Sequence, residues 1–273
     1  MSSRTSRGWQ IASNALKVLN ANKQLLVFPV LSGLTILLII SSFFIGFALK
    51  FGLESDLGAF TRGGLIYVWV FLFYFVSYFI VVFFNMALIH CATLYFRGEQ
   101  PTVSKGLSFS MSRLGLILSW AAFSATIGML LQMIQDKLGF LGKLLTSVIG
   151  LAWSVATFFA IPVIAYEKLG PMEAVRRSTQ IMKEKWGESL VANFSFGVIV
   201  LCAIGVLAIV SIALSELVSI FLGIGLFIAG IIIVAIISGA IKSIIISAAY
   251  NNMDGDIDTH FNRQLLDGLF MEK

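Results

Sequence analysis

Hydrophobic residues fill six long segments of this chain, and short polar stretches separate them. Each segment reaches or exceeds the roughly 20 residues that an α-helix needs to cross a bilayer. The segments are Leu25–Leu49, Gly64–Phe96, Leu114–Met133, Phe140–Tyr166, Ser189–Leu214 and Ile220–Tyr250. The pattern therefore predicts an all-α fold, a polytopic membrane helical bundle of six transmembrane helices.

Three of the polar stretches, Ser3–Lys23, Gly98–Arg113 and Gly170–Gly187, have the spacing of basic amphipathic helices. In the third, Pro171 follows a glycine and begins a helix, because a fixed φ and a missing N–H suit the first turn. The predicted apolar faces are Trp9, Ala12, Leu16 and Leu19; Val103, Leu107, Met111 and Leu114; and Ala174, Val175, Ser178, Ile181 and Met182. Such helices lie along a membrane surface, and the third leads into a transmembrane helix.

The order of elements repeats three times along the chain, as a surface helix, a span, a short link and a second span. The repeats are residues 3–96, 101–166 and 171–250, and each ends near a tyrosine, at Tyr95, Tyr166 and Tyr250. Residues 1–250 are therefore predicted to form a single membrane domain, followed by a short polar cytoplasmic tail at residues 251–273.

Six spans place both termini on one side of the membrane, and the distribution of cations predicts which side. Fourteen Lys and Arg residues lie on the terminal side, and four lie opposite. They are Arg4, Arg7, Lys17, Lys23, Arg97, Lys105, Arg113, Lys168, Arg176, Arg177, Lys183, Lys185, Arg263 and Lys273 against Lys50, Arg62, Lys137 and Lys143. Because cytoplasmic loops carry the excess of Lys and Arg, both termini and all three surface helices are predicted to be cytoplasmic.

The composition supports membrane embedding and limits the choice of partners. Hydrophobic residues make up 58% of the chain and charged residues 12%, which is too apolar for one soluble domain of 273 residues. The net charge of +5 does not indicate nucleic acid, because the cations lie beside the apolar segments. The predicted partners are membrane lipids with anionic headgroups, together with a membrane-protein partner or a second copy of the chain.

Six cations are predicted to contact those headgroups: Arg176, Arg177, Lys183, Lys185, Lys105 and Arg113. In this interpretation Val175, Ile181 and Met182 enter the boundary region of the membrane. The alternative is that the cations pair with Glu167, Glu173, Glu184 and Glu188, which would make the third helix a docked part of the bundle.

Residue patterns for catalysis are missing from the sequence. It contains no glycine-rich phosphate loop with a lysine, no H-E-x-x-H and no G-x-S-x-G, and its only histidines are His90 and His260. We therefore predict no enzymatic activity, no cofactor and no metal site. The alternating carboxylates Asp254, Asp256 and Asp258 resemble a calcium loop, but Thr259 and Leu265 replace its glycine and its bidentate glutamate, so a solvated acidic turn is predicted. Cys91 and Cys202 are interpreted as small buried residues.

Four polar residues interrupt the apolar segments: Asn85, His90, Asn193 and Lys242. They either make hydrogen bonds between helices or share a polar pocket that opens to the cytoplasm. A second pattern is a stripe of small residues at every fourth position, Ala235, Gly239, Ser243 and Ser247, which predicts close packing against another helix.

Two stretches of the sequence carry a family resemblance. RGEQPTVSKGLSFSMSRLGLILSWAAFSATIG and GLAWSVATFFAIPVIAYEKLGPMEAVRRSTQIMKEKWGESLVANFSFG resemble an uncharacterised bacterial family of six-span integral membrane proteins, a domain of unknown function. The second stretch also resembles, more distantly, the membrane domain of some glycerophosphodiester phosphodiesterases, and NKQLLVFPVLSGL resembles the start of CysZ-type sulfate permeases. The resemblance implies the bacterial cytoplasmic (inner) membrane and carries no activity.

Two functions compete on this sequence. Passive permeation or transport of a small solute would use the polar residues inside the spans. A membrane scaffold or assembly factor would instead bind anionic lipid or partner proteins through the three basic surface helices. No carboxylate lies deep in a predicted span, so the proton or sodium relay of an energised transporter is not expected.

Overall fold

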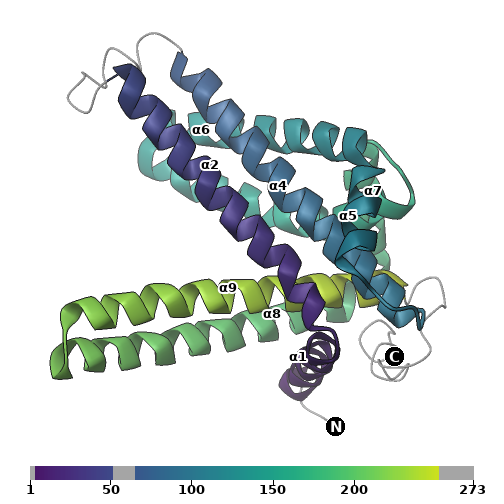
Figure 1. The fold of residues 1–273 in the computed structure, drawn as a ribbon. Coiled ribbons are helices and arrows are strands. Elements are labelled where there is room, and N and C mark those ends of the chain that lie inside the picture. The colour runs from purple at the N-terminus through teal and green to yellow at the C-terminus, as the bar shows by residue number, and fades with distance from the viewer. Residues whose placement is uncertain (1–3, 52–64, 252–273) are drawn as a thin grey trace. The chain divides into compact units, whose positions relative to one another are not determined.

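The computed structural model of the protein describes residues 4–51 and 65–251, and the regular structure within them is helical (Figure 1). Within these residues, five stretches are long and apolar enough to cross a membrane: Lys23–Gly46, Tyr67–Phe96, Leu114–Tyr166, Gly197–Leu217 and Ile220–Asn251. The helices are α1 (Arg4–Ala21), η1 (Lys23–Leu26), α2 (Val27–Phe51), α4 (Leu65–Phe96), α5 (Val103–Met111), α6 (Leu114–Ala156), α7 (Ala160–Tyr166), α8 (Pro171–Leu217) and α9 (Ile220–Asn251). The all-helical prediction is therefore confirmed for the described part of the chain.

Helix α6 folds back on itself at Gly139. This glycine has φ 55° and ψ −123°, a backbone conformation that side chains with a Cβ rarely adopt. A straight helix would separate Trp120 and Trp153 by about 50 Å, at 1.5 Å per residue. Their rings instead stack with centroids 6.2 Å apart, and Gln135 donates a 2.8 Å hydrogen bond to Thr146 Oγ1. Residues 114–138 and 140–156 are therefore two antiparallel arms of one hairpin.

The second arm of α6 is separated from α7 by a break at residues 157–159. Pro162 supplies a physical reason, because its ring lacks an N–H and clashes with the carbonyl four residues earlier. The predicted segment Phe140–Tyr166 is therefore two helices in the structure.

The chain divides into two compact units. Unit 1 comprises the described residues of Met1–Pro29, Leu88–Val103 and Lys183–Lys273, and unit 2 comprises those of Val30–Ala87 and Ser104–Met182. Helices α2, α4 and α8 each continue from one unit into the other. The single domain over residues 1–250 and its three repeats remain predictions.

In unit 1, α1 and η1 pack against α9. Helix α9 is mostly exposed over its first twenty residues and mostly buried from Ala240 to Asn251. Ala15, Val18 and Leu19 of α1 are buried, whereas Leu16, which was predicted to lie on the apolar face, is exposed. The prediction for Leu16 was wrong. The apolar residues of α1 cover a wide arc of the helix surface, and only part of that arc contacts other helices.

The hairpin of α8 and α9 in unit 1 packs closely at glycines that were not predicted. A Cβ at Gly223 would lie 2.5 Å from the Ser211 carbonyl oxygen, and one at Gly230 would lie 2.5 Å from Leu207 side-chain carbons. The predicted stripe is only partly buried. Ser243 and Ser247 are buried, but Ala235 and Gly239 are exposed, and a Cβ at Gly239 would meet open space.

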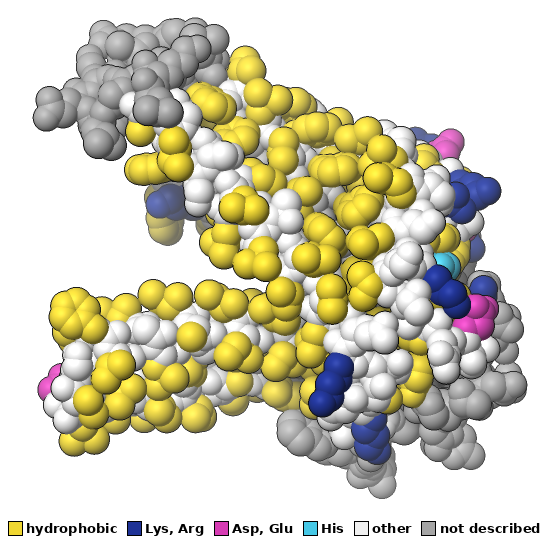
Figure 2. Space-filling view, viewed as in Figure 1, with side chains coloured by type: hydrophobic (Ala, Val, Ile, Leu, Met, Phe, Trp, Pro, Cys, Tyr) yellow, Lys and Arg dark blue, Asp and Glu magenta, His cyan; other side chains and the backbone are white. Residues whose placement is uncertain are grey.

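The outer surface of this hairpin is apolar. Leu201, Ile209, Leu217 and Phe221 are largely exposed, and Figure 2 shows hydrophobic side chains along its length. Exposed apolar side chains over whole helices are typical of a surface that faces lipid. Cys202 lies in this exposed region, so the prediction that it is buried was wrong, whereas Cys91 is buried as predicted.

Candidate functional site

Three helices of unit 2 meet at one end of the α6 hairpin, the end opposite Gly139. They are α5, α7 and the first turns of α8, and we call this region the basic end (Figure 1). Helix α8 begins at Pro171, as predicted, with Glu173 in its first turn. The turn before it contains Lys168, whose φ of 56° is the left-handed conformation that ends a helix.

An ion pair fastens the start of α8 to the end of α7. Arg177 Nε donates to both carboxylate oxygens of Glu167, at 3.0 and 3.1 Å. The two side chains are 35% and 28% exposed, so water screens the attraction, and the pair mainly fixes orientation. The alternative interpretation, in which cations of this helix pair with carboxylates, therefore holds for Arg177.

A second contact fills the break between α6 and α7. Phe159 lies in this break, immediately before α7, and its backbone N–H donates a 3.0 Å hydrogen bond to Ser178 Oγ. Ser178 is fully buried, together with Ala174, Ile181 and Met182 on the same face of α8. Four of the five residues of the predicted apolar face are therefore buried, and the fifth, Val175, is half-buried. However, Ile181 and Met182 are covered by protein, so the prediction that they enter the membrane boundary was wrong.

Arg113 joins α5 and α7. Its Nε donates a 3.1 Å hydrogen bond to the carbonyl oxygen of Ala165, in the last turn of α7, where a cation also interacts favourably with the helix dipole. Its guanidinium carbon lies 5.2 Å from the centroid of the Phe109 ring, at cation–π distance. The Phe109 ring in turn lies 5.7 Å from that of Tyr166.

Helix α5 is held to α4 by a small, polar face. Ser110 Oγ donates a 2.9 Å hydrogen bond to the carbonyl oxygen of Phe83, and Gly106 is buried beside it. Met111, which was predicted to lie on the apolar face, is 61% exposed. That prediction was wrong, because the small residues of α5 allow a closer approach than its large ones.

The outer surface of the basic end keeps three exposed cations, Lys105, Lys168 and Arg176. Figure 2 shows Lys and Arg side chains near this end of the molecule. Arg113 and Arg177 thus hold helices together, and Lys168 and Arg176 are exposed at the same end. Lys183 is exposed in the part of α8 that belongs to unit 1, and the side chain of Lys185 lies outside the described residues.

Unit 1 contains a buried polar cluster between the ends of α4 and α9. Asn251 Nδ2 donates to Thr93 Oγ1 at 3.0 Å and to the Ser247 carbonyl oxygen at 2.7 Å. The hydroxyls of Thr93 and Ser247 lie 3.0 Å apart, and each also donates to the carbonyl oxygen of Ile89. All three side chains are buried, so these hydrogen bonds satisfy one another and join the two helices.

The model of a family of unknown function, DUF6159, matches residues 64–257. The chain belongs to DUF6159. No curated protein and no solved structure matches it. The region matched in DUF6159 runs from the start of α4 to the end of α9 and includes the basic end and the polar cluster. The distant likenesses to phosphodiesterase membrane domains and sulfate permeases remain predictions.

The structure of this DUF6159 chain does not test the predicted polar pocket. Asn85 and His90 are half-buried on α4, five residues apart, so ideal helix geometry turns them about 140° from each other. Lys242 is exposed on α9, and the side chain of Asn193 lies outside the described residues. Whether these four residues form a pocket remains a prediction.

Two contacts in the DUF6159 chain were missed from sequence. Ser178 was assigned to an apolar face, and Thr93 was not identified at all. The contact of Ser178 could have been predicted from Pro162, because a proline inside a span predicts a broken helix whose backbone groups need a hydrogen-bond partner. Within residues 4–51 and 65–251, no group of three His, Cys, Asp or Glu residues is placed to hold a metal ion. The acidic string at residues 254–258 lies outside the described residues.

Proposed function

We propose that this protein is a multi-pass scaffold of the bacterial cytoplasmic membrane, which binds anionic lipid and protein partners through its basic end. The observation that carries the proposal is the docking of α8. Arg177 bonds to Glu167 and Ser178 to the Phe159 amide, so the first turns of α8 are packed in a fixed position in the bundle. A fixed helix with exposed cations is a surface that another component can recognise.

Six crossings follow if each arm of α6 spans the membrane. The first arm, at about 37 Å, exceeds the roughly 30 Å hydrocarbon core. The second arm is about 26 Å long, and α7 adds about 10 Å. With α2, α4, α8 and α9 this makes six spans, both termini lie on one side, and the charge bias places that side in the cytoplasm.

The exposed and the bonded cations of the basic end are expected to have different roles. Lys168→Gln with Arg176→Gln should remove most of the stabilisation that anionic phosphatidylglycerol gives over zwitterionic phosphatidylcholine, because each surface cation contributes about 1 kcal/mol near an anionic membrane. Arg177→Gln should instead lower stability in both lipids, since it breaks the pair with Glu167. The measurement is the melting temperature of the purified chain in nanodiscs of each lipid.

The control for this experiment is Lys137→Gln with Lys143→Gln, which also removes two exposed cations of unit 2 but at the α6 turn. It should leave the difference between the two lipids unchanged. Equal melting temperatures of the wild type in the two lipids, or equal losses in both double variants, would exclude lipid recognition at the basic end.

Passive permeation is the second candidate, and one observation favours it. The break at residues 157–159 is a discontinuous helix, and in transporters such breaks expose backbone groups that bind a solute or ion. Here the Phe159 amide is bonded to Ser178, which favours a packing role for the break. Solute uptake into proteoliposomes, compared between wild type and Ser178→Ala, distinguishes the two candidates.

A further inference from the structure

A second basic surface lies in unit 1, on elements that pack together. Helix α1, η1 and residues 240–251 of α9 contain no Asp or Glu. Their cations are Arg4, Arg7, Lys17, Lys23 and Lys242. The side chains of Lys17, Lys23 and Lys242 are described, and all three are exposed. Those of Arg4 and Arg7 lie outside the described side chains. Positive charge without compensating carboxylates favours an anionic ligand.

The position of Lys242 indicates how close this surface is to the membrane. Between Ala240 and Asn251, it is the only exposed residue of α9. It lies about 14 Å from the end of α9, at 1.5 Å per residue, and the twenty residues before Ala240 are mostly exposed and apolar. Its ammonium group is therefore at the level where the lipid-facing part of α9 ends.

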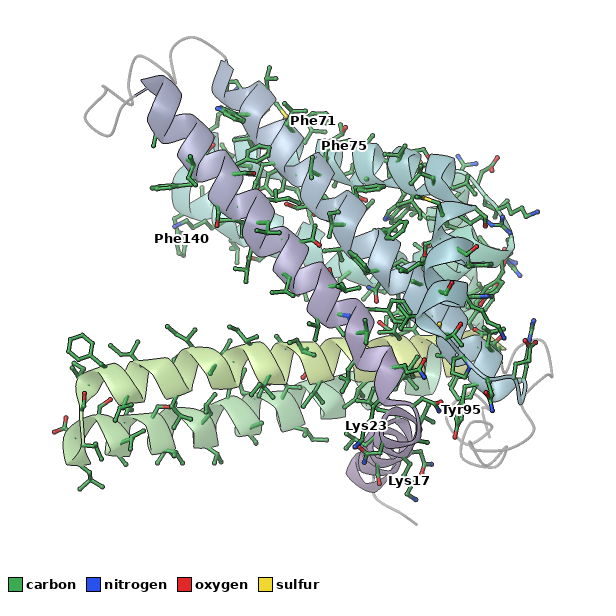
Figure 3. All side chains as sticks on the ribbon, in the orientation of Figure 1. Lys17, Lys23, Phe71, Phe75, Tyr95 and Phe140 are labelled. Carbon is green, nitrogen blue, oxygen red and sulfur yellow. The ribbon has the colours of Figure 1, made fainter. Side chains whose placement is uncertain are left out.

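The packing of unit 1 brings η1 to this level. Helix α1 and η1 both contact α9, and the part of α9 that is buried is its last twelve residues. Leu25 of η1 is fully buried in the same unit, while Lys23 at the start of η1 is exposed. Figure 3 shows Lys17 on α1 and Lys23 close to where α1 ends. Among the described residues, none of these three lysines has an ionic partner in the structure.

We propose that Lys17, Lys23 and Lys242 form a binding site for an anionic phospholipid, whose phosphate the lysines hold at the edge of the bilayer. A lipid phosphate is the anion found at this depth, whereas soluble anions stay in water. This site is separate from the basic end of unit 2. It shares with the proposed function the embedding of the protein in a membrane and the class of ligand, but none of the residues.

The test is lipid retention by the full chain in neutral detergent, measured by native mass spectrometry with phosphatidylglycerol and phosphatidylcholine as probes. Wild type should retain phosphatidylglycerol selectively, and inorganic phosphate should not compete with it. Lys23→Gln with Lys242→Gln should retain it about 30-fold more weakly, as expected for two lysines. Lys242→Arg should retain it like wild type.

The matched control is again Lys137→Gln with Lys143→Gln, which removes the same charge from exposed positions of unit 2. It should leave retention unchanged. The proposal is overturned if both double variants lose retention equally, or if inorganic phosphate displaces the lipid. It is also overturned if Lys23→Gln with Lys242→Gln has a lower melting temperature than wild type in phosphatidylcholine, because the loss of retention would then reflect a loss of folding. The basic end is tested by Lys168 and Arg176, so either site can fail without the other.

Discussion

Replacing Gly223 with leucine is expected to destabilise the α8–α9 hairpin by about 3 kcal/mol or more. A Cβ at this position would lie 2.5 Å from the Ser211 carbonyl oxygen and would overlap the Ser215 hydroxyl. Backbone cannot move aside as a flexible side chain does, so the two helices must separate along the tip of the hairpin. The measurement is thermal unfolding of the purified variant in detergent, followed by circular dichroism.

The same hairpin offers matched controls. Gly225→Leu, two residues later, and Gly239→Leu both place the new side chain where nothing lies within 4 Å of the Cβ. Both are expected to unfold close to the wild-type temperature. If Gly239→Leu is as damaging as Gly223→Leu, then another helix contacts the predicted stripe at Gly239, and the open space beside this residue in the structure is wrong.

Ser178→Ala is expected to cost about 1–3 kcal/mol in the free energy of unfolding. Alanine removes only the hydroxyl that accepts the hydrogen bond, so the Phe159 N–H is left buried and unpaired at the helix break. The expected consequence extends beyond stability, because the bond positions α8, and backbone amides 157–159 should exchange hydrogen faster. Hydrogen exchange with mass spectrometry measures this directly.

Thr179→Val is the control for that experiment. Thr179 is the next residue of α8, and its hydroxyl donates only to the carbonyl oxygen of Val175 in the same helix. The substitution should change stability by no more than about 0.5 kcal/mol and leave exchange at the break unaltered. Faster exchange at 157–159 in both variants would mean that Ser178 does not close the break.

The sequence predicted element positions better than contacts. Helix α8 begins at Pro171 and α4 ends at Phe96, as predicted, because proline and the boundary of an apolar run are local signals. The turn containing Gly139 was also predicted, although the first arm of α6 continues five residues beyond Met133. Polarity alone did not reveal this extension, because Ile134 and Leu138 are as compatible with a link as with a helix end.

Contacts depend on the partner surface, which periodicity does not contain. A small residue permits close approach without specifying whether anything approaches, so Gly239 was chosen by spacing although Gly223 and Gly230 make the contacts. The same limit applies to charge. Glu167 was named only as one of four candidate carboxylates, because it lies ten residues before Arg177 and only the turn between α7 and α8 brings the two together.

In the topology that we propose, α6 crosses the membrane twice, so that its Gly139 turn and the basic end lie on opposite sides. Lys143→Cys and Lys168→Cys, each at an exposed position, report on the two sides in a chain whose Cys91 and Cys202 are replaced by serine. A membrane-impermeant maleimide applied to intact cells should label the cysteine at 143 and reach that at 168 only after the membrane is permeabilised. Labelling of both cysteines from the same side would contradict the account.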